Sequence, residues 1–209
     1  MKLIFLKVIN IAFLCLFIIL SGCSKNHRVL INPSIPIHDS NIGDGLPVAV
    51  KVVDVRSSNV ISKWQGGFKV RKFTVISQGD LKDIFTTRIR QGLTKLGFSP
   101  KNFSSNAERS LEIEILNIKS HYQENPPKMN ILVKADVRAI CQSRGKRFSK
   151  SFTSRMSRSD ISPASFPNEN LLNSSLSEIM GEIFSDPALI ACLTHNPTNP
   201  QARTIPLTN

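Results

Sequence analysis

Hydrophobic and polar residues alternate most regularly between Met129 and Cys141, where every second position is apolar. A period of two places these apolar side chains on one face of a β-strand and the charged ones on the other. Shorter alternating segments predict strands at Phe68–Ile76, Ser110–Ser120 and Arg147–Arg158. A valine-rich segment predicts a strand at Val48–Arg56, and a brief strand is expected at Arg28–Ile31. The alternation indicates half-buried strands, which are typical of an antiparallel sheet.

A helical period replaces the alternation in two places. Apolar residues fall on one helical face between Leu81 and Leu96, with Ser77 or Asp80 as N-cap and Gly97 as C-terminal cap. The second stripe comprises Leu172, Leu176, Ile179, Met180 and Ile183. After it, Asp186-Pro187 predicts a short terminal helix over Ala188–Leu193.

The order of these elements predicts an α+β fold, with one antiparallel sheet of about five to six strands and two main helices packed on one face. We expect this domain to span residues 47–193. Residues 23–46 would provide a polar tether, Ser24–His27, and the brief first strand, and residues 194–209 a flexible C-terminal tail. Ser57–Gly67 is expected to be a loop, because Gly66-Gly67 is a turn signal.

Residues 1–22 have the parts of a signal peptide. Lys2 and Lys7 accompany an apolar run, Val8–Leu20, that is too short to cross a bilayer as a helix. Leu20, Ser21 and Gly22 then precede Cys23, which resembles the lipobox of bacterial lipoproteins. The resemblance implies that the lipoprotein signal peptidase recognises those three residues and cuts before Cys23, whose thiol carries diacylglycerol. An ordinary secretory signal with an incidental cysteine is the alternative.

Several short segments also resemble YajG-type lipoproteins in order and spacing. They are Val29-Leu30-Ile31-Asn32-Pro33, Asp54-Val55-Arg56, Leu96-Gly97-Phe98, Lys134-Ala135-Asp136 and the closing helix, whereas the residues between Arg56 and Phe68 depart from the pattern. The resemblance implies an outer-membrane or periplasmic lipoprotein and brings no catalytic residues. Ser24, in place of Asp, implies sorting to the outer membrane by resemblance to enterobacterial lipoproteins.

Positive charge is the main compositional clue to partners. The chain has 27 Lys and Arg against 15 Asp and Glu, and loss of Lys2 and Lys7 with the signal peptide would leave a net charge of +10. Seven cations lie within 21 residues: Arg138, Arg144, Lys146, Arg147, Lys150, Arg155 and Arg158. We expect them to form a platform for anionic lipid, lipopolysaccharide or cell wall, and the alternative is a solvated hairpin. Export disfavours nucleic acid as a partner.

Other candidate sites have simpler explanations. Asp54 and Arg56 share one face of a strand, where an ion pair that fixes the strand end is favoured over a recognition pair. Ser143-x-x-Lys146 matches a serine–lysine acyl-transfer motif, but Gly145 predicts a turn between strands instead of the helical turn that this chemistry needs. The four histidines, His27, His38, His121 and His195, lack metal-ligand spacing, so we expect neither metal nor cofactor.

Cys141 and Cys192 remain once Cys23 is used by lipid and Cys15 is removed. An oxidising compartment allows a disulfide between them, and two buried thiols are the alternative.

As a whole, the sequence predicts a non-enzymatic, membrane-anchored envelope lipoprotein that binds or scaffolds an anionic component. An auxiliary subunit of an envelope transport or assembly complex is the second hypothesis, and a wall-modifying enzyme is a weaker third.

Overall fold

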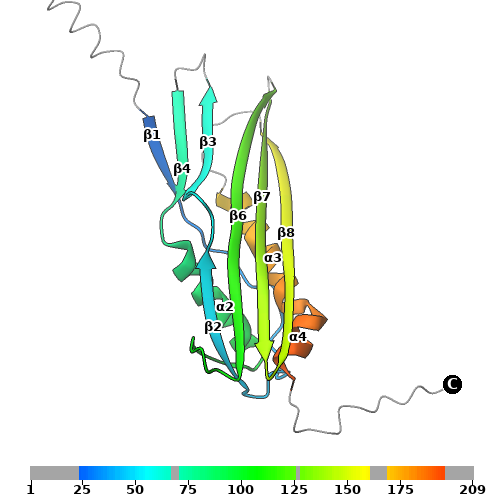
Figure 1. Cartoon of the computed structure of the whole chain (residues 1–209). Coiled ribbons are helices and arrows are strands. Elements are labelled where there is room, and N and C mark those ends of the chain that lie inside the picture. The colour runs from blue at the N-terminus through cyan, green and yellow to red at the C-terminus, as the bar shows by residue number, and fades with distance from the viewer. Residues whose placement is uncertain (1–23, 67–70, 126–127, 161–168, 196–209) are drawn as a thin grey trace, which may run out of the picture.

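The computed structural model describes residues 24–66, 71–125, 128–160 and 169–195 (Figure 1). The signal peptide, Cys23 and residues 196–209 of the C-terminal tail therefore lie outside the described residues. Within the described part of the chain, no helix is both long and apolar enough to cross a membrane. The fold is α+β, as the order of elements predicts.

The larger sheet contains β2 (Pro47–Asp54), β5 (Ser99–Asn102), β6 (Arg109–Asn125), β7 (Lys128–Ser143) and β8 (Lys146–Asp160) in the order β5-β2-β6-β7-β8. The strands β6, β7 and β8 form an antiparallel meander, but β2 runs parallel to both of its neighbours. The expectation of a purely antiparallel sheet is thus wrong at β2. Parallel neighbours need a long crossover, which the chain from β3 through α2 provides here.

The smaller sheet contains β1 (Ser24–Val29), β3 (Val60–Gly66) and β4 (Arg71–Ser77) in the order β1-β4-β3. Two expectations are wrong here, because Ser24–His27 is part of a strand instead of a tether, and Ser57–Gly67 contains β3. The polar sequence of β1 joins the sheet through its backbone, which pairs in parallel with β4 from Ser24↔Lys72 to Val29↔Ser77. In β3, Ile61 is fully buried and Trp64 stacks on Phe73 of β4 at 4.8 Å between ring centroids.

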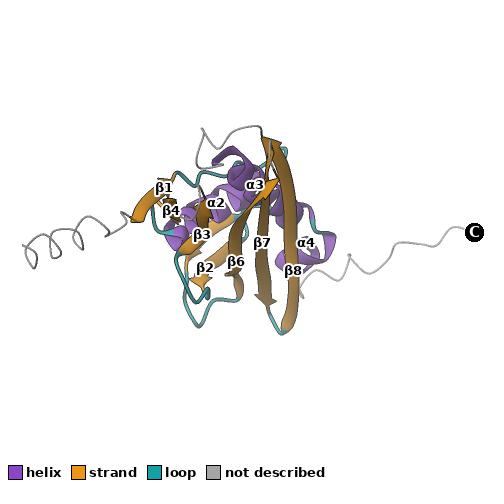
Figure 2. Ribbon diagram, turned by 90° about the horizontal axis from the view of Figure 1, so that it is seen from above, coloured by secondary structure: helices purple, strands orange, loops and turns teal. Residues whose placement is uncertain are grey.

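The helices α2 (Leu81–Lys95), α3 (Glu169–Ser185) and α4 (Pro187–Leu193) lie together on one face of the larger sheet (Figure 2). Asp80 and Asp186 cap α2 and α4, since their carboxylates accept hydrogen bonds at 2.8 Å from the backbone N–H of Lys82 and Leu189. Gly97 ends α2 with a φ of +82°, which glycine adopts most easily. The sequence signals for helix ends are therefore confirmed.

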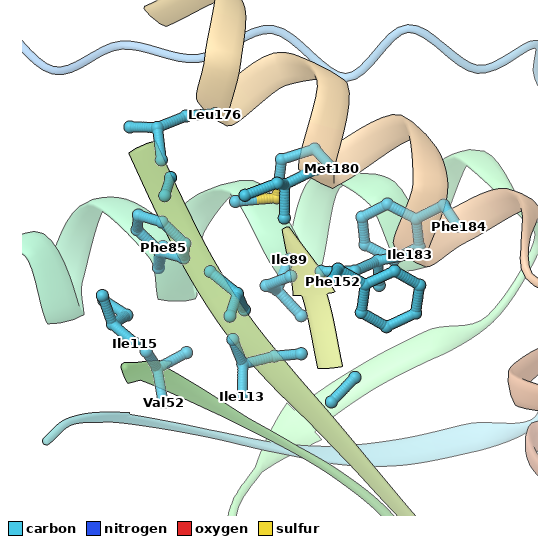
Figure 3. Close-up of a cluster of buried hydrophobic side chains, with 14 of the residues drawn as sticks. Val52, Phe85, Ile89, Ile113, Ile115, Phe152, Leu176, Met180, Ile183 and Phe184 are labelled. Atoms are coloured by element: carbon cyan, nitrogen blue, oxygen red, sulfur yellow. The ribbon is translucent and has the colours of Figure 1, made fainter. Parts of the chain in front are cut away.

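The core lies between this helical layer and the larger sheet (Figure 3). Phe85 and Ile89 from α2 and Leu176 and Met180 from α3 pack over Ile113 of β6, and all five are fully buried. Burial of a side chain of this size stabilises the fold by about 1.5–3 kcal/mol. The two helices approach so closely that a Cβ on Gly92 would lie 2.1 Å from the ring of Phe184.

Residues 30–38 form a strap over α2 and α3. On the α3 side, Asn173 accepts from the backbone N–H of Asn32 at 2.7 Å and donates to the carbonyl of Leu30 at 3.0 Å. On the α2 side, Arg88 donates to the side-chain oxygen of Asn32. The Asn32-Pro33 segment that marks the family resemblance thus belongs to a strap that links β1 to both helices.

Candidate functional site

The position of β1 determines where any lipid on Cys23 would be attached. Leu20, Ser21, Gly22 and Cys23 lie outside the described residues, but the next residue, Ser24, already pairs with Lys72 in the smaller sheet. The start of β1 lies at the same end of the molecule as the turn-side ends of β6 and β7, Asn125 and Lys128 (Figure 1). We call this the β1 end. A lipid on Cys23 would therefore be held close to this end.

The seven cations from Arg138 to Arg158 do not form one surface. The register of β7 with β8 places Lys146, Lys150 and Arg158 on the helix side of the sheet and Arg147 and Arg155 on the opposite side with Arg138. At about 3.3 Å per residue, Lys146 and Arg158 are roughly 40 Å apart along β8. The expectation of a single platform is therefore wrong, because consecutive residues of a strand point to opposite faces.

At least three of these seven cations have carboxylate partners among the described residues. Arg138 pairs with Glu114, Arg144 pairs with Glu108 at 2.6 Å, and Lys150 pairs with Asp186 at 2.6 Å. Lys150 and Asp186 join β8 to the start of α4, so this cation has a structural role.

A different cationic group appears on the face of the larger sheet opposite the helices, which we call the outer face. Lys119 of β6 lies directly opposite Lys134 of β7, which in turn lies directly opposite Arg155 of β8. We call these three residues the basic row. Like charges directly opposite each other on neighbouring strands destabilise a sheet. The basic row is therefore a local conflict between charge and fold, and such conflicts are typical of functional positions.

One carboxylate partly offsets the basic row. Asp136 lies 2.9 Å from the ammonium group of Lys134 and also accepts hydrogen bonds from Thr153 at 2.8 Å and Asn117 at 3.1 Å. Burial opposes ionisation of Asp136, but the hydrogen bonds from Lys134, Thr153 and Asn117 outweigh it and lower its pKa. Asp136 therefore stays ionised beside Lys134. Among the described residues, Lys119 and Arg155 have no ion pair.

Lys119 and Lys134 are not among the cations that the sequence pattern predicts for a binding surface. A signal was present, because the two-residue turn at Arg144-Gly145 fixes the register of β7 with β8 and hence places Lys134 opposite Arg155. Counting back along β6 and forward along β7 from the pair Asn125↔Lys128 likewise places Lys119 opposite Lys134. Positions that are far apart in sequence can thus be aligned from the two hairpins.

Asp54 and Arg56 form the ion pair that the sequence analysis favours. The guanidinium group of Arg56 donates from Nε to Oδ1 of Asp54 at 2.8 Å and from Nη2 to Oδ2 at 2.7 Å. Burial opposes ionisation of Asp54, but the hydrogen bonds from Arg56 outweigh it and lower the pKa of Asp54. Since only 7% of the Arg56 side chain is exposed, the pair fixes the end of β2 and presents little of its guanidinium group to a partner.

The arrangement of Ser143 and Lys146 does not match serine–lysine chemistry. The two residues are opposite each other at the hairpin, and the Ser143 hydroxyl donates to the carbonyl of His195 at 3.5 Å. In the part of the chain that the structure describes, no group of three or more His, Cys, Asp or Glu residues could hold a metal ion.

Cys141 at the end of β7 and Cys192 in α4 form a disulfide, with an S–S distance of 2.07 Å. Both cysteines are buried, and the bond ties the last described helix to the sheet. Its role is therefore structural.

Comparisons with known proteins give one family and several distant structures. A protein from Xanthomonas campestris is 10% identical, with a TM-score of 0.45 over 82% of this chain and 96% of that chain. A minor lipoprotein from Acinetobacter baumannii is 15% identical, with a TM-score of 0.38 over 67% and 88% of the two chains. A lipoprotein from Neisseria meningitidis is 12% identical, with a TM-score of 0.38 over 66% and 97%. No curated protein matches the chain, and the family model that matches residues 33–194 is described as "uncharacterized lipoprotein".

Proposed function

Because this chain belongs to the uncharacterized lipoprotein family whose model spans residues 33–194, we propose that it is a lipid-anchored, non-enzymatic protein of the bacterial envelope. In this proposal the outer face binds an envelope component that carries phosphate or carboxylate groups. The observation that carries the proposal is the basic row, in which Lys119, Lys134 and Arg155 lie opposite one another on three neighbouring strands.

The proposed anchor is diacylglycerol on Cys23, with further acylation of its amino group after cleavage. Pairing of Ser24 with Lys72 supports a short link, since one or two residues span only about 7 Å. The link would keep the β1 end at the membrane surface. The identity of Ser24 favours the outer membrane, with the domain facing the periplasm.

The three cations of the basic row can pair with the phosphate or carboxylate groups of an anionic partner. Near an anionic membrane surface, each Lys or Arg gains roughly 1 kcal/mol. The alternative is that the outer face is simply a solvated sheet surface, in which case the cations would contribute nothing to binding. The two explanations differ in whether removal of these three charges changes affinity more than removal of three other charges.

Vesicle binding by the unlipidated chain from Ser24, which retains every described element, tests this difference. The measurement is co-sedimentation with phosphatidylcholine vesicles that contain increasing phosphatidylglycerol, and polyphosphate and lipopolysaccharide in solution form two further arms. Replacement of the basic row by glutamine (K119Q/K134Q/R155Q) is expected to weaken binding by roughly 100-fold, from about 1 kcal/mol per cation.

The matched control is K63Q/K82Q/K146Q, which removes three exposed cations from β3, α2 and the start of β8. It should bind several-fold less tightly at most, since it lowers only the net charge. Equal binding by the two triple variants would contradict a role for the basic row. Binding to polyphosphate or lipopolysaccharide without binding to vesicles would identify a soluble polymer or glycolipid as the source of the phosphate groups.

The second candidate is an auxiliary subunit of an envelope complex. The observation in its favour is that β8 is the last strand in the order of the larger sheet. The edge of β8 that faces away from β7 can therefore accept a strand from a partner. Crosslinking of membranes that contain the native lipidated protein tests this candidate. Recovery of one stoichiometric protein partner crosslinked through residues of β8 would favour it over binding of an anionic component.

A further inference from the structure

A polar pocket of about 260 Å³ lies on the outer face, away from the β1 end. Its floor consists of side chains of β6 and β7, including Ser110, Glu112 and Gln142, and its wall is the loop after β5, with Phe103 and Ser104. This wall of the pocket is fixed by contacts at the end of the loop. At the loop's end, Glu108 pairs with Arg144 at 2.6 Å and its carbonyl accepts the backbone N–H of Arg144 at 3.0 Å.

The charges at the pocket are almost balanced. Its two carboxylates, on Glu112 and Glu114, are paired with Lys51 at 3.0 Å and with Arg138 respectively. Arg147 adds one further cation to the lining. Because the carboxylates are already neutralised, the pocket does not attract a cation, and a single arginine gives little preference for a multivalent anion. The charge balance therefore favours a neutral ligand.

The polar groups of the lining include both donors and acceptors. The hydroxyl of Ser110 and the amide of Gln142 can each donate and accept, Arg147 donates, and the carboxylate of Glu112 accepts. A ligand that satisfies all of them needs several groups that are donors and acceptors at once. Hydroxyl groups have this property, so the lining fits a polyhydroxylated ligand.

Phe103 supplies an apolar surface at the rim. Its side chain is 46% exposed, and the ammonium group of Lys51 lies 5.2 Å from the ring centroid. An aromatic ring held at the edge of a polar pocket offers a flat apolar face beside hydrogen-bonding groups, the combination that orients a ligand with both properties. Pyranose rings have this composition, with hydroxyl groups around the rim and C–H groups on one face.

We infer that this pocket binds one pyranose ring of an envelope glycan. The volume suits a single ring, because it lies below the roughly 300–1,000 Å³ of sites for drug-sized ligands. The inference rests on the proposed function in that it places the protein beside envelope glycans. Along β6, Glu112 and Lys119 are roughly 23 Å apart on the same face. A glycan that carries phosphate or carboxylate groups can therefore reach the pocket and the basic row together.

Titration of the mature protein with two neutral oligosaccharides tests the inference. The probes are the trimer of N-acetylglucosamine and maltotriose, followed by saturation-transfer NMR and calorimetry. Binding of either in the millimolar range is expected, and Phe103→Ala and Gln142→Ala should each weaken it at least tenfold. The matched control, Ile42→Ala, removes another exposed apolar side chain, 51% exposed, and should leave the affinity unchanged.

The two sugars distinguish the possible sources. Preference for the N-acetylated trimer indicates the glycan strands of the cell wall, and preference for maltotriose indicates a hexose-containing polysaccharide. The triple variant K119Q/K134Q/R155Q should bind neutral sugars normally, so loss of vesicle binding and loss of sugar binding are separate results. If neither sugar binds at roughly 10 mM, or if both pocket variants bind as tightly as the wild type while retaining its thermal stability, the inference is wrong.

Discussion

Lys134 of β7 lies directly opposite Arg155 of β8 on the outer face of the sheet. Two cations in this relationship repel each other, and Lys119 on the other side of Lys134 adds to the repulsion. Asp136 compensates for one of the three charges. The remaining repulsion gives the basic row an energetic signature that can be measured without any ligand.

Replacement of Lys119 by glutamine should stabilise the domain. The gain is expected to be roughly 0.2–1 kcal/mol in the free energy of unfolding, because the cross-strand repulsion with Lys134 is removed. Urea denaturation of the unlipidated chain measures it. Lys63→Gln, at an exposed site on β3, is the control and should change stability by less than about 0.5 kcal/mol. A destabilised Lys119→Gln protein would show that Lys119 makes a favourable contact in the fold.

Replacement of Cys23 by alanine should prevent lipidation. We expect either an uncleaved precursor or a protein that a salt wash releases from membranes, because stable anchoring needs two or more acyl chains. Normal maturation together with salt-resistant membrane association would contradict the lipoprotein interpretation. Separation of the two membranes on a density gradient checks the expected outer-membrane location of the wild type.

Reduction of the disulfide between Cys141 and Cys192 should destabilise the domain. The two cysteines are 51 residues apart, and closing a loop of that length stabilises by about 4 kcal/mol in the chain-entropy model. Urea denaturation with and without reductant measures the difference, and Cys141→Ser/Cys192→Ser should unfold at the same urea concentration in both conditions. Mass spectrometry of protein from the envelope provides the independent check, since two free thiols there would contradict the bond.

Asp186 should make stability depend on pH in the acidic range. Burial opposes its ionisation, but hydrogen bonds from Lys150 and from the backbone N–H of Leu189 outweigh this effect and lower its pKa below 3.8. Because the folded-state pKa is the lower one, the stabilisation is complete well above pH 4 and is lost as pH falls through the folded-state value.

Asp186→Asn retains a side-chain oxygen that can cap α4 but removes the charge that pairs with Lys150. The variant should therefore lose less stability than the wild type between pH 7 and pH 3, the range that brackets the ordinary carboxylate pKa. Urea denaturation at both pH values measures this. Identical losses in the two proteins would show that Asp186 does not contribute to the pH dependence.

The sequence predicts those parts of the fold in which one face is buried and the other is exposed. In β7 every second side chain is buried against the helical layer, so the alternation in sequence follows directly from the packing. The strand β1 gives no such signal, because its polar Ser-Lys-Asn-His sequence has no alternation, although its backbone pairs with β4 and the ring of His27 packs edge-on against Phe73. Side-chain pattern says little about an edge strand whose residues are polar.

The candidate site was less predictable for a related reason. Cations that are adjacent in the sequence of one strand point to opposite faces of the sheet, as Lys146 and Arg147 do. The basic row instead combines residues from three strands, and only the register of two hairpins brings them together. The pocket depends on the loop after β5 as well, and its position over the sheet follows from the pair of Glu108 and Arg144.

The parallel pairing of β1 with β4 determines how the domain would respond to mechanical force. Six residue pairs connect the two strands, from Ser24↔Lys72 to Val29↔Ser77. If Cys23 is fixed in a membrane and the domain is pulled away from it, the tension runs along the axis of β1. The backbone hydrogen bonds of a parallel ladder are evenly spaced along the strand, so they resist this shear together instead of opening one after another.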